Sequence, residues 1–500
     1  MKRLLVIAMV FVFAASAFAV NLELKGGAEM FGRMHSLSYD SGITGDEEFE
    51  NSYSMMLGYY RLDGKMIIDE STIFNIRALL FDGWYGGDGN ALADRGNING
   101  IGAQDSKVFD RFWVDYKLTD NIALAAGRMP AAYNGGDFGL NWYVGAQGWN
   151  RDWAGGHDSV RIDYTLNDTA TIFAAFDMLS QDFRSGTASM DADLFVLGAK
   201  IKPTSDISIN PTLTYMHASN ATAMKDVDED GLPGNDNNDD ANNGALDTTK
   251  EIDYDKPALG KAIGFHLNVE KMPATGIQVK GNFAMYKQLA DNMTVFENST
   301  GGYEKPMLFG ASLEGTYVTD TLKAGAFFAY ASSDEDAVAS FAFGDDWNKT
   351  QIIDNGLHLT GGLGTTGMMQ LGLYTEIELV EKLTLNIVGA YYMNAAGEIA
   401  NSNGQTPARW GDLNGGTGVF DNGDYVNING PAGTSKNINN NGGYLYKDAT
   451  MYEFDLYATY QWTKATGFRL GAAYMGASDL WREGDSLSDL AVYGHISTWF

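Results

Sequence analysis

The chain has 500 residues, with 64 acidic and 34 basic side chains and a formal net charge of −30, which argues against nucleic acid as a partner. It has no cysteine, so the sequence predicts neither disulfides nor thiolate metal sites. The 26 Tyr, 26 Phe and 60 Gly residues accompany a hydrophobic fraction of 45%. This mixture is typical of a membrane β-barrel, in which only alternate strand residues meet lipid.

The N-terminal segment has the pattern of a cleaved secretory signal. Lys2 and Arg3 precede the apolar run Leu4–Ala14, and Ala17 and Ala19 occupy the small-residue positions before a cleavage site. The apolar run is too short to span a bilayer as a helix. We expect a signal peptide over residues 1–19 and one domain over residues 20–500, because no linker or change of periodicity divides the remainder.

From residue 22 onwards, segments of alternating polar and apolar residues follow one another to the end of the chain. Tight turns such as Asp69-Glu70-Ser71 alternate with long polar connections, giving eight short turns and nine longer connections. An even number of strands returns the C-terminus to the side of the N-terminus. The segments expected to be strands are 22–37, 53–68, 72–81, 108–118, 122–128, 160–166, 171–178, 194–202, 207–217, 262–271, 277–287, 307–318, 322–330, 368–379, 383–393, 452–462, 468–474 and 489–500.

This pattern predicts an all-β fold, a transmembrane antiparallel up-and-down β-barrel of 18 strands, with 16 as the alternative. Short turns would face the periplasm and long loops the exterior. In segment 368–379, Leu371 and Leu373 fall on one face, and Tyr374 and Glu376 on the other. The apolar face would meet lipid, where only a closed sheet satisfies the backbone. Aromatic residues near segment ends fit interfacial girdles: Tyr116, Tyr164, Tyr317, Tyr391 and Trp462.

The last segment, Asp489–Phe500, is apolar on one face and ends on an aromatic residue. An unpaired edge this hydrophobic would promote aggregation, so its natural partner is the first strand. The segment resembles the closing strand of bacterial outer-membrane β-barrels. The resemblance implies a location in the bacterial outer membrane. It also implies recognition of the terminal aromatic residue by the barrel assembly machinery.

A second resemblance lies within Arg111–Leu166, which covers roughly a tenth of the chain. Phe112–Leu118, the motif Ala126-Gly127-Arg128 and Asp158–Tyr164 together look like the corresponding strands of alginate-export-type and related bacterial porins. The resemblance implies passage of solutes across the outer membrane and transfers no particular substrate.

We therefore expect a porin, a water-filled channel for passive diffusion of small hydrophilic solutes, ions and sugars among them. A selective export channel for an anionic polysaccharide and a structural or adhesive surface barrel are the alternatives. An enzyme is not expected, because none of the six histidines stands at a defining spacing from a nucleophile or carboxylate. Outer-membrane lipid is the expected partner, and the sequence leaves assembly into a homo-oligomer open.

Charged residues on the strand face opposite to the apolar, lipid-facing one are candidates to line the pore. The basic residues would form one continuous wall, because the last strand pairs with the first, and the acidic residues would lie across the barrel. Such walls create a transverse field that favours charged or dipolar solutes. The alternative is that the charges pair locally and only solvate the lumen. The candidates are Arg33, Arg61, Arg77, Arg111, Arg161, Arg469, Glu314, Glu376, Glu378, Glu453 and Asp455, and Arg128 is excluded by its lipid-side parity.

The third long loop, Met129–His157, is the expected constriction, because aromatic faces and nearby charges suit polar solutes such as sugars. The alternative is an external loop anchored by tryptophans at the membrane interface. The residues concerned are Trp142, Tyr143, Trp149, Arg151, Asp152 and Trp153.

The loop Ala218–Ala258 contains the sharpest motif. Asp226, Asp228 and Asp230 occupy positions 1, 3 and 5 of an EF-hand-like calcium loop, and the Leu232 carbonyl would be the next ligand. A solvated acidic loop is the alternative. No other cofactor is required, and the Asn- and Gly-rich segment 394–448 has no legible role.

Overall fold

The computed structural model describes the strands, their short turns and part of one long connection. The described residues are 21–40, 49–86, 109–129, 157–180, 191–225, 251–289, 307–334, 339–340, 349–353, 368–395, 449–479, 484 and 486–499. The predicted signal peptide and the terminal Phe500 lie outside them.

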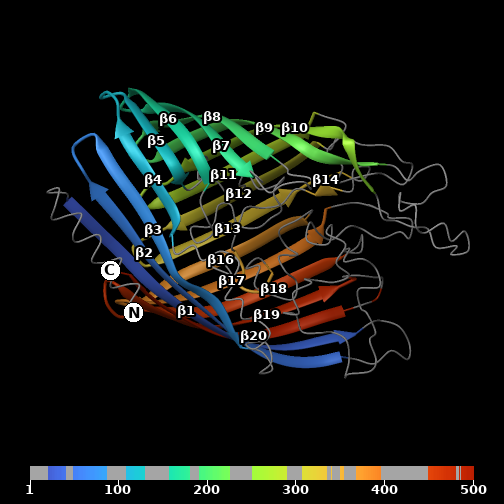
Figure 1. Cartoon of the computed structure of the whole chain (residues 1–500). Coiled ribbons are helices and arrows are strands. Elements are labelled where there is room, and N and C mark those ends of the chain that lie inside the picture. Colours follow the sequence, from blue (N-terminus) through green and yellow to red (C-terminus); the bar gives the residue numbers. More distant parts are fainter. Residues whose placement is uncertain are drawn as a thin grey trace, which may run out of the picture.

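Within these residues, 18 strands form one closed antiparallel sheet, drawn as a barrel in Figure 1. Sequential strands are hydrogen-bonded neighbours around the ring, except that β14 (Ser333–Asp334) and β15 (Ala339–Ser340) form a separate small hairpin. The barrel strands are β1 (Asn21–Asp40), β2 (Phe49–Ile67), β3 (Thr72–Gly86), β4 (Phe109–Lys117), β5 (Ile122–Met129), β6 (His157–Asn167), β7 (Ala170–Ser180), β8 (Asp191–Thr204), β9 (Ile207–Lys225), β10 (Glu251–Lys271), β11 (Gly276–Gln288), β12 (Met307–Val318), β13 (Leu322–Ala331), β16 (Met368–Val380), β17 (Leu383–Asn394), β18 (Thr450–Gln461), β19 (Thr466–Ser478) and β20 (Ser486–Trp499).

The first and last strands close the ring. β1 pairs with β2 on one side and with β20 on the other, in a register that runs from Gly27 opposite Trp499 to Asp40 opposite Ser486. The predicted number of strands and the predicted closure are both confirmed. Because every barrel strand has two neighbouring strands, none of the strands in the described part of the chain is an edge strand of the sheet.

Four of the short turns are stabilised by the same kind of side-chain hydrogen bond. The side-chain oxygen of Asp69 accepts the backbone N–H groups of Ser71 (2.8 Å) and Thr72 (2.7 Å). The hydroxyl groups of Thr119, Thr319 and Thr463 accept N–H groups two and three residues onward in the same way. Such Asx- and ST-turns satisfy backbone donors where the ladder stops. The Ser71 N–H group also lowers the pKa of the exposed Asp69 carboxyl.

Several strands are longer than the sequence indicates, β9 and β10 most of all. β9 continues to Lys225 and β10 begins at Glu251, so both ends of the segment 218–258, expected to be a loop, are paired strand. The pairing is irregular between Asp253 and Pro257, where proline removes a donor from the ladder. The predicted calcium ligands Asp226, Asp228, Asp230 and Leu232 lie outside the described residues.

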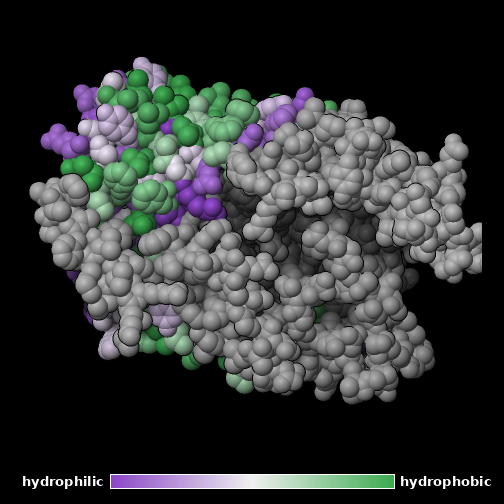
Figure 2. Space-filling view, in the orientation of Figure 1, coloured by the Kyte–Doolittle hydropathy of each residue, from purple (hydrophilic) through white to green (hydrophobic). Residues whose placement is uncertain are grey.

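The two faces of the sheet differ in polarity. Large apolar side chains point outward, with Leu371, Leu373 and Leu470 exposed by 57%, 67% and 68%. Figure 2 shows hydrophobic residues dominating the outer surface over β5 to β8. The inward face carries most of the buried polar residues, including Arg33, His35, Arg77, Arg111, Glu453 and Asp455. No helix of the described residues is long and apolar enough to cross a membrane.

Candidate functional site: the lumen wall and an inner segment

The predicted basic residues lie on neighbouring strands and share the inward face. Arg77 on β3 lies opposite Arg111 on β4, and both are buried. Arg61 on β2 lies opposite Gly27 on β1, six residues before Arg33 along the inward parity of that strand. Arg128 lies opposite the outward-facing Phe112, as its exclusion from the wall requires.

Carboxylates fix the orientation of several of these guanidinium groups. Asp63 accepts from Arg61 Nε at 2.7 Å and from Arg77 Nε at 2.9 Å, so one carboxylate bridges two strands. Arg161 donates to Asp163 at 2.6 Å. Since planar guanidinium groups in such pairs lose rotational freedom, the wall presents them in fixed positions. Local pairing, the alternative interpretation of the lumen charges, therefore applies to these residues.

Aromatic rings lie against several arginines of the basic wall. The guanidinium carbon of Arg61 lies 4.8 Å from the ring centre of Trp499, and that of Arg161 lies 4.5 Å from Phe173. Arg469 on β19 stacks on Tyr457 at 4.8 Å. Cation–π contacts of this kind are strongest where water is excluded. Several guanidinium groups of the basic wall, those of Arg61, Arg161 and Arg469, are thus stacked on rings.

Three of the predicted acidic residues, Glu314, Glu376 and Glu378, lie in different environments. Glu314 on β12 accepts from Tyr374 Oη at 2.6 Å and from Lys349 Nζ at 2.5 Å. Glu376 is half exposed and pairs with Lys323 at 2.9 Å. Glu378 is exposed near the turn after β16.

Glu453 and Asp455 on β18 do not face open lumen, because residues 349–353 lie against them. We call these five residues the inner segment. Its residues Thr350 and Ile353 are 0% exposed, and Glu453 is 2% exposed. The segment belongs to the long connection between β13 and β16, yet it lies inside the barrel.

Three successive backbone N–H groups of the inner segment point at the Glu453 carboxylate. The donors are Gln351 (2.8 Å), Ile352 (2.5 Å) and Ile353 (2.7 Å). The Gln351 N–H group also donates to Asp455 at 3.1 Å. Charge-assisted bonds from backbone donors are short and strong, and here they satisfy a carboxylate that water does not reach.

The first three residues of the inner segment also bind side chains from β12, β17 and β1. Lys349 pairs with Glu314 on β12, and the Thr350 hydroxyl bonds to that of Tyr392 on β17 at 2.7 Å. Arg33 Nη1 on β1 donates to the Gln351 carbonyl at 3.0 Å. The segment therefore runs along the inner wall from β12 towards the closing seam.

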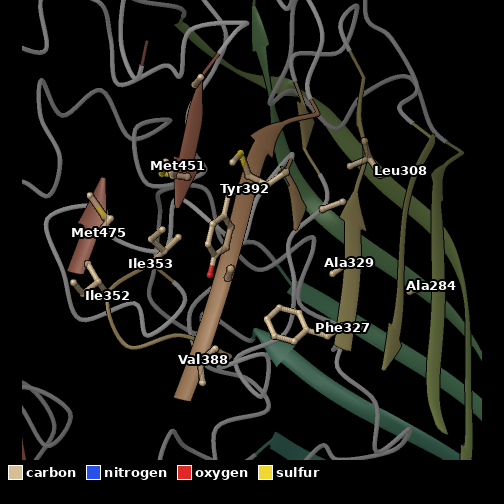
Figure 3. Close-up of a cluster of buried hydrophobic side chains, with 14 of the residues drawn as sticks. Ala284, Leu308, Phe327, Ala329, Ile352, Ile353, Val388, Tyr392, Met451 and Met475 are labelled. Atoms are coloured by element: carbon tan, nitrogen blue, oxygen red, sulfur yellow. The ribbon is translucent and has the colours of Figure 1, made fainter. Parts of the chain in front are cut away.

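Apolar packing supports these polar contacts. Figure 3 shows Ile353 between Met451 and Tyr392, and Ile352 beside Met475, within one buried cluster. A buried isoleucine contributes about 1.5–3 kcal/mol. Together with the carboxylate contacts, this packing fixes the inner segment in one position.

The expectation that the acidic residues oppose the basic wall is wrong for Glu453 and Asp455. β18 lies only three strands from β1 through β19 and β20, and Arg33 and Glu453 bind the same residue, Gln351. Glu314 on β12, and Glu376 and Glu378 on β16, lie far around the ring from the arginines of β2 to β4. Sequence parity locates the face of a strand but does not show what covers it.

The sequence alone does not predict the inner segment. Its only sequence signal is the pair Ile352-Ile353 within a polar connection. The expected constriction residues Trp142, Tyr143, Trp149, Arg151, Asp152 and Trp153 lie outside the described residues. Among the described residues, no group of three or more possible ligands could hold a metal ion.

No model of a known protein family matches the chain, and no curated protein matches it. Its barrel is similar to solved structures from Pseudomonas aeruginosa. OpdQ has 9% identity and a TM-score of 0.46, covering 95% of this chain and 97% of that chain. OccK3 (OpdO) has 9% identity and a TM-score of 0.45, covering 95% of each chain. The outer membrane protein OprD has 10% identity and a TM-score of 0.39, covering 94% of this chain and 93% of that chain. With TM-scores this low, these likenesses decide nothing about the solute or about the role of any residue.

Proposed function

We propose that the protein is an outer-membrane porin, a channel through which small hydrophilic solutes diffuse passively. The observation that carries the proposal is the division of one closed sheet into an apolar outer face and a charged inner face. Among β-structures in lipid, only a closed sheet satisfies every backbone donor and acceptor. An inward face with arginines and carboxylates needs water, which a lumen supplies.

The outward aromatic residues support a membrane position for the barrel. Tyr116, Tyr164, Tyr317 and Trp462 are exposed by 44%, 46%, 54% and 59%, and all lie at the end with the short turns. Tyrosine and tryptophan prefer the interface between lipid tails and water. We infer that the short turns face the periplasm, the long connections face the exterior, and the barrel assembly machinery inserts the protein.

Within this proposal the lumen wall selects solutes, and no enzymatic step is required. On the described inward face of β1 to β6, basic side chains outnumber carboxylates only when lysines are counted with the arginines, and the inner segment covers Glu453. The basic residues are Arg33, Arg61, Arg77, Arg111, Arg161, Lys25, Lys65 and Lys117, and the carboxylates are Glu23, Glu29, Asp63, Asp115 and Asp163. This imbalance supports anions and dipolar solutes over cations. It equally supports the finer alternative, an export channel for an anionic polysaccharide of the alginate type.

The inner segment supports the competing structural or adhesive barrel, because it fills part of the lumen beside β17 and β18. Conductance of the purified protein in planar bilayers separates the two functions. A porin gives stepwise channels with small ions, and sugars or oligouronates reduce the current as they enter. A protein that inserts with its barrel folded but gives no steps would be structural.

We also propose roles for two groups of loop residues that lie outside the described part of the chain. The aromatic set around Trp149 would narrow the pore, and Asp226, Asp228 and Asp230 would bind calcium weakly, with a Kd of about 10⁻⁴–10⁻³ M. Titration calorimetry of the wild type against Asp228→Ala tests the calcium site. Equal heats would remove it.

A further inference from the structure

Three nitrogen-bearing side chains share the outward face at the end of the barrel with the long connections. His217 has the parity of the exposed Leu213 on β9, Lys261 that of Ile263 on β10, and Lys287 that of Phe283 on β11. None of the three points into the lumen. They form what we call the rim patch.

The strand register places these side chains together. His217 lies directly opposite Lys261 across β9 and β10, and Lys287 lies directly opposite Ile263 across β10 and β11. Directly opposed Cβ atoms are about 4.5–5.5 Å apart, and diagonal neighbours such as Lys261 and Lys287 about 7–8 Å. One phosphate group can therefore contact both ammonium groups.

The rim patch lies at the depth of a membrane interface. Phe195 and Tyr215, with ring centres 6.1 Å apart, form the next outward row towards the middle of the barrel. Below them follow Leu197 and Leu213, exposed by 52% and 48%. Aromatic residues mark the boundary between lipid tails and headgroups, so the side chains immediately beyond them meet headgroups.

Among the residues whose side chains the structure describes, neither lysine has an acidic partner, although the chain carries a formal net charge of −30. Lys65, Lys117, Lys323 and Lys349 each have a carboxylate within 4.0 Å in this part of the chain, whereas Lys261 and Lys287 have none. Asp193, the described outward acidic residue nearest to the patch by register, lies opposite His217, on the side away from the lysines. By contrast, the outward Arg128 on β5 has Asp158 at 4.0 Å.

We propose that the rim patch binds the phosphate groups of anionic lipid headgroups. Lys261 and Lys287 supply the charge, and the ring of His217 supplies a further N–H donor. The proposal rests on the proposed function, because it requires this face to lie in a membrane. It commits to a lipid phosphate, since the apolar rows below the patch receive the acyl chains of the same molecule.

The test uses the full-length barrel in neutral detergent. Native mass spectrometry measures the binding of a bisphosphorylated glycolipid and of phosphatidylcholine to the wild type, to the double variant Lys261→Gln with Lys287→Gln, and to Arg128→Gln. Each cation near an anionic surface contributes about fivefold in affinity, so the double variant should lose about 30-fold for the phosphorylated lipid. Arg128→Gln, whose cation already has a carboxylate, should bind like the wild type, and binding should weaken with salt.

Equal affinity of the double variant and the wild type would overturn the proposal. So would inorganic phosphate that displaces the lipid at similar concentration, because the site would then be one for free anions. Planar-bilayer conductance of the same double variant should equal that of the wild type. If the wild type forms no channels, the proposed porin function is refuted. Weaker binding of the phosphorylated lipid by the double variant than by Arg128→Gln would still support the rim patch.

Discussion

The indole ring of Trp499 lies over the backbone of Gly27, its direct partner across the seam between the last strand and the first. A Cβ added at Gly27 would lie 2.1 Å from Trp499 Cε3, so only glycine leaves room for the ring. On the next strand, Arg61 lies opposite Gly27 and stacks on the same indole at 4.8 Å. Three strands are thereby joined at one point of the inner wall by an aromatic ring that covers a glycine.

The first prediction follows from this contact. Gly27→Ala should displace the indole and destabilise the barrel by about 1–3 kcal/mol through overpacking. Gly32→Ala, on the same strand, has no heavy atom within 4 Å of the added Cβ and is the matched control. Urea unfolding of the folded barrel, followed by its heat-modifiable gel shift, measures both. Equal midpoints for the two variants would mean that Trp499 does not hold the seam.

The second prediction concerns the inner segment. Glu453→Gln replaces one acceptor oxygen with an amide group that cannot accept, which costs about 1–3 kcal/mol for a buried donor left unsatisfied. The inner segment should then leave the wall, and single-channel conductance should rise. At about 1 M salt the Debye length is about 3 Å, so a change in conductance there reflects pore size rather than wall charge. Glu376→Gln, half exposed on β16, is the control and should leave this conductance unchanged.

Thiol labelling gives a second measurement of the same release. The chain has no cysteine, so Ile353→Cys supplies the only thiol, at a position that is 0% exposed. A water-soluble maleimide should label it slowly in the otherwise native barrel and rapidly when Glu453→Gln is added. Equal labelling rates would show that Glu453 does not hold the segment.

The third prediction tests the basic wall. Replacing Arg77 and Arg111 together by Ala should shift the reversal potential towards cation selectivity, because two positive charges leave a low-dielectric wall. Arg128→Ala, on the outer face, should leave the reversal potential unchanged. The shift should shrink between about 0.1 and 1 M salt. If both variants behave alike at low salt, the arginines do not face the conducting path.

The fourth prediction concerns the turn at Asp69. Because backbone N–H groups lower its pKa in the folded protein, Asp69 stabilises the turn above the pKa of the unfolded chain, and this contribution disappears as pH falls through the lowered value. The pH window in which this stabilisation is lost therefore extends below the ordinary pKa of an aspartate carboxyl group. Asp69→Thr reproduces the hydroxyl turns at Thr119, Thr319 and Thr463 and should remove this part of the acid sensitivity.

The midpoint of urea unfolding, compared between neutral pH and pH about 3, measures the acid sensitivity of both proteins. Asp69→Ala, which removes the acceptor altogether, should be less stable than Asp69→Thr at every pH. An unchanged pH dependence in both variants would assign the acid sensitivity to other carboxyl groups.

The fold could be predicted from the sequence because the two-residue alternation of a β-strand is a local pattern. Alternation of two residues assigns a face, and turn residues such as Asp69 and Thr119 mark the reversals, so the number of strands and the closing pair could both be predicted. The extra length of β9 and β10 could not, because their ends are polar and irregular. Nothing in the period of β18 indicates that Glu453 is covered by a segment 100 residues earlier in the chain. That contact depends on how a long connection folds back, and polar backbone donors leave no periodic trace in a sequence.

The pairing of β1 with β20 also determines when the barrel can close. Gly27 and Trp499 lie on the first and last strands of the ring and are far apart in sequence, so β20 is required to complete the sheet. Loop-closure entropy opposes such a distant pairing until the intervening strands are in place. A chain truncated before β20 would leave β1 and β19 each with an unpaired edge, which promotes aggregation. The ring can therefore close only after β20 has been made, and until then the sheet keeps two reactive edges.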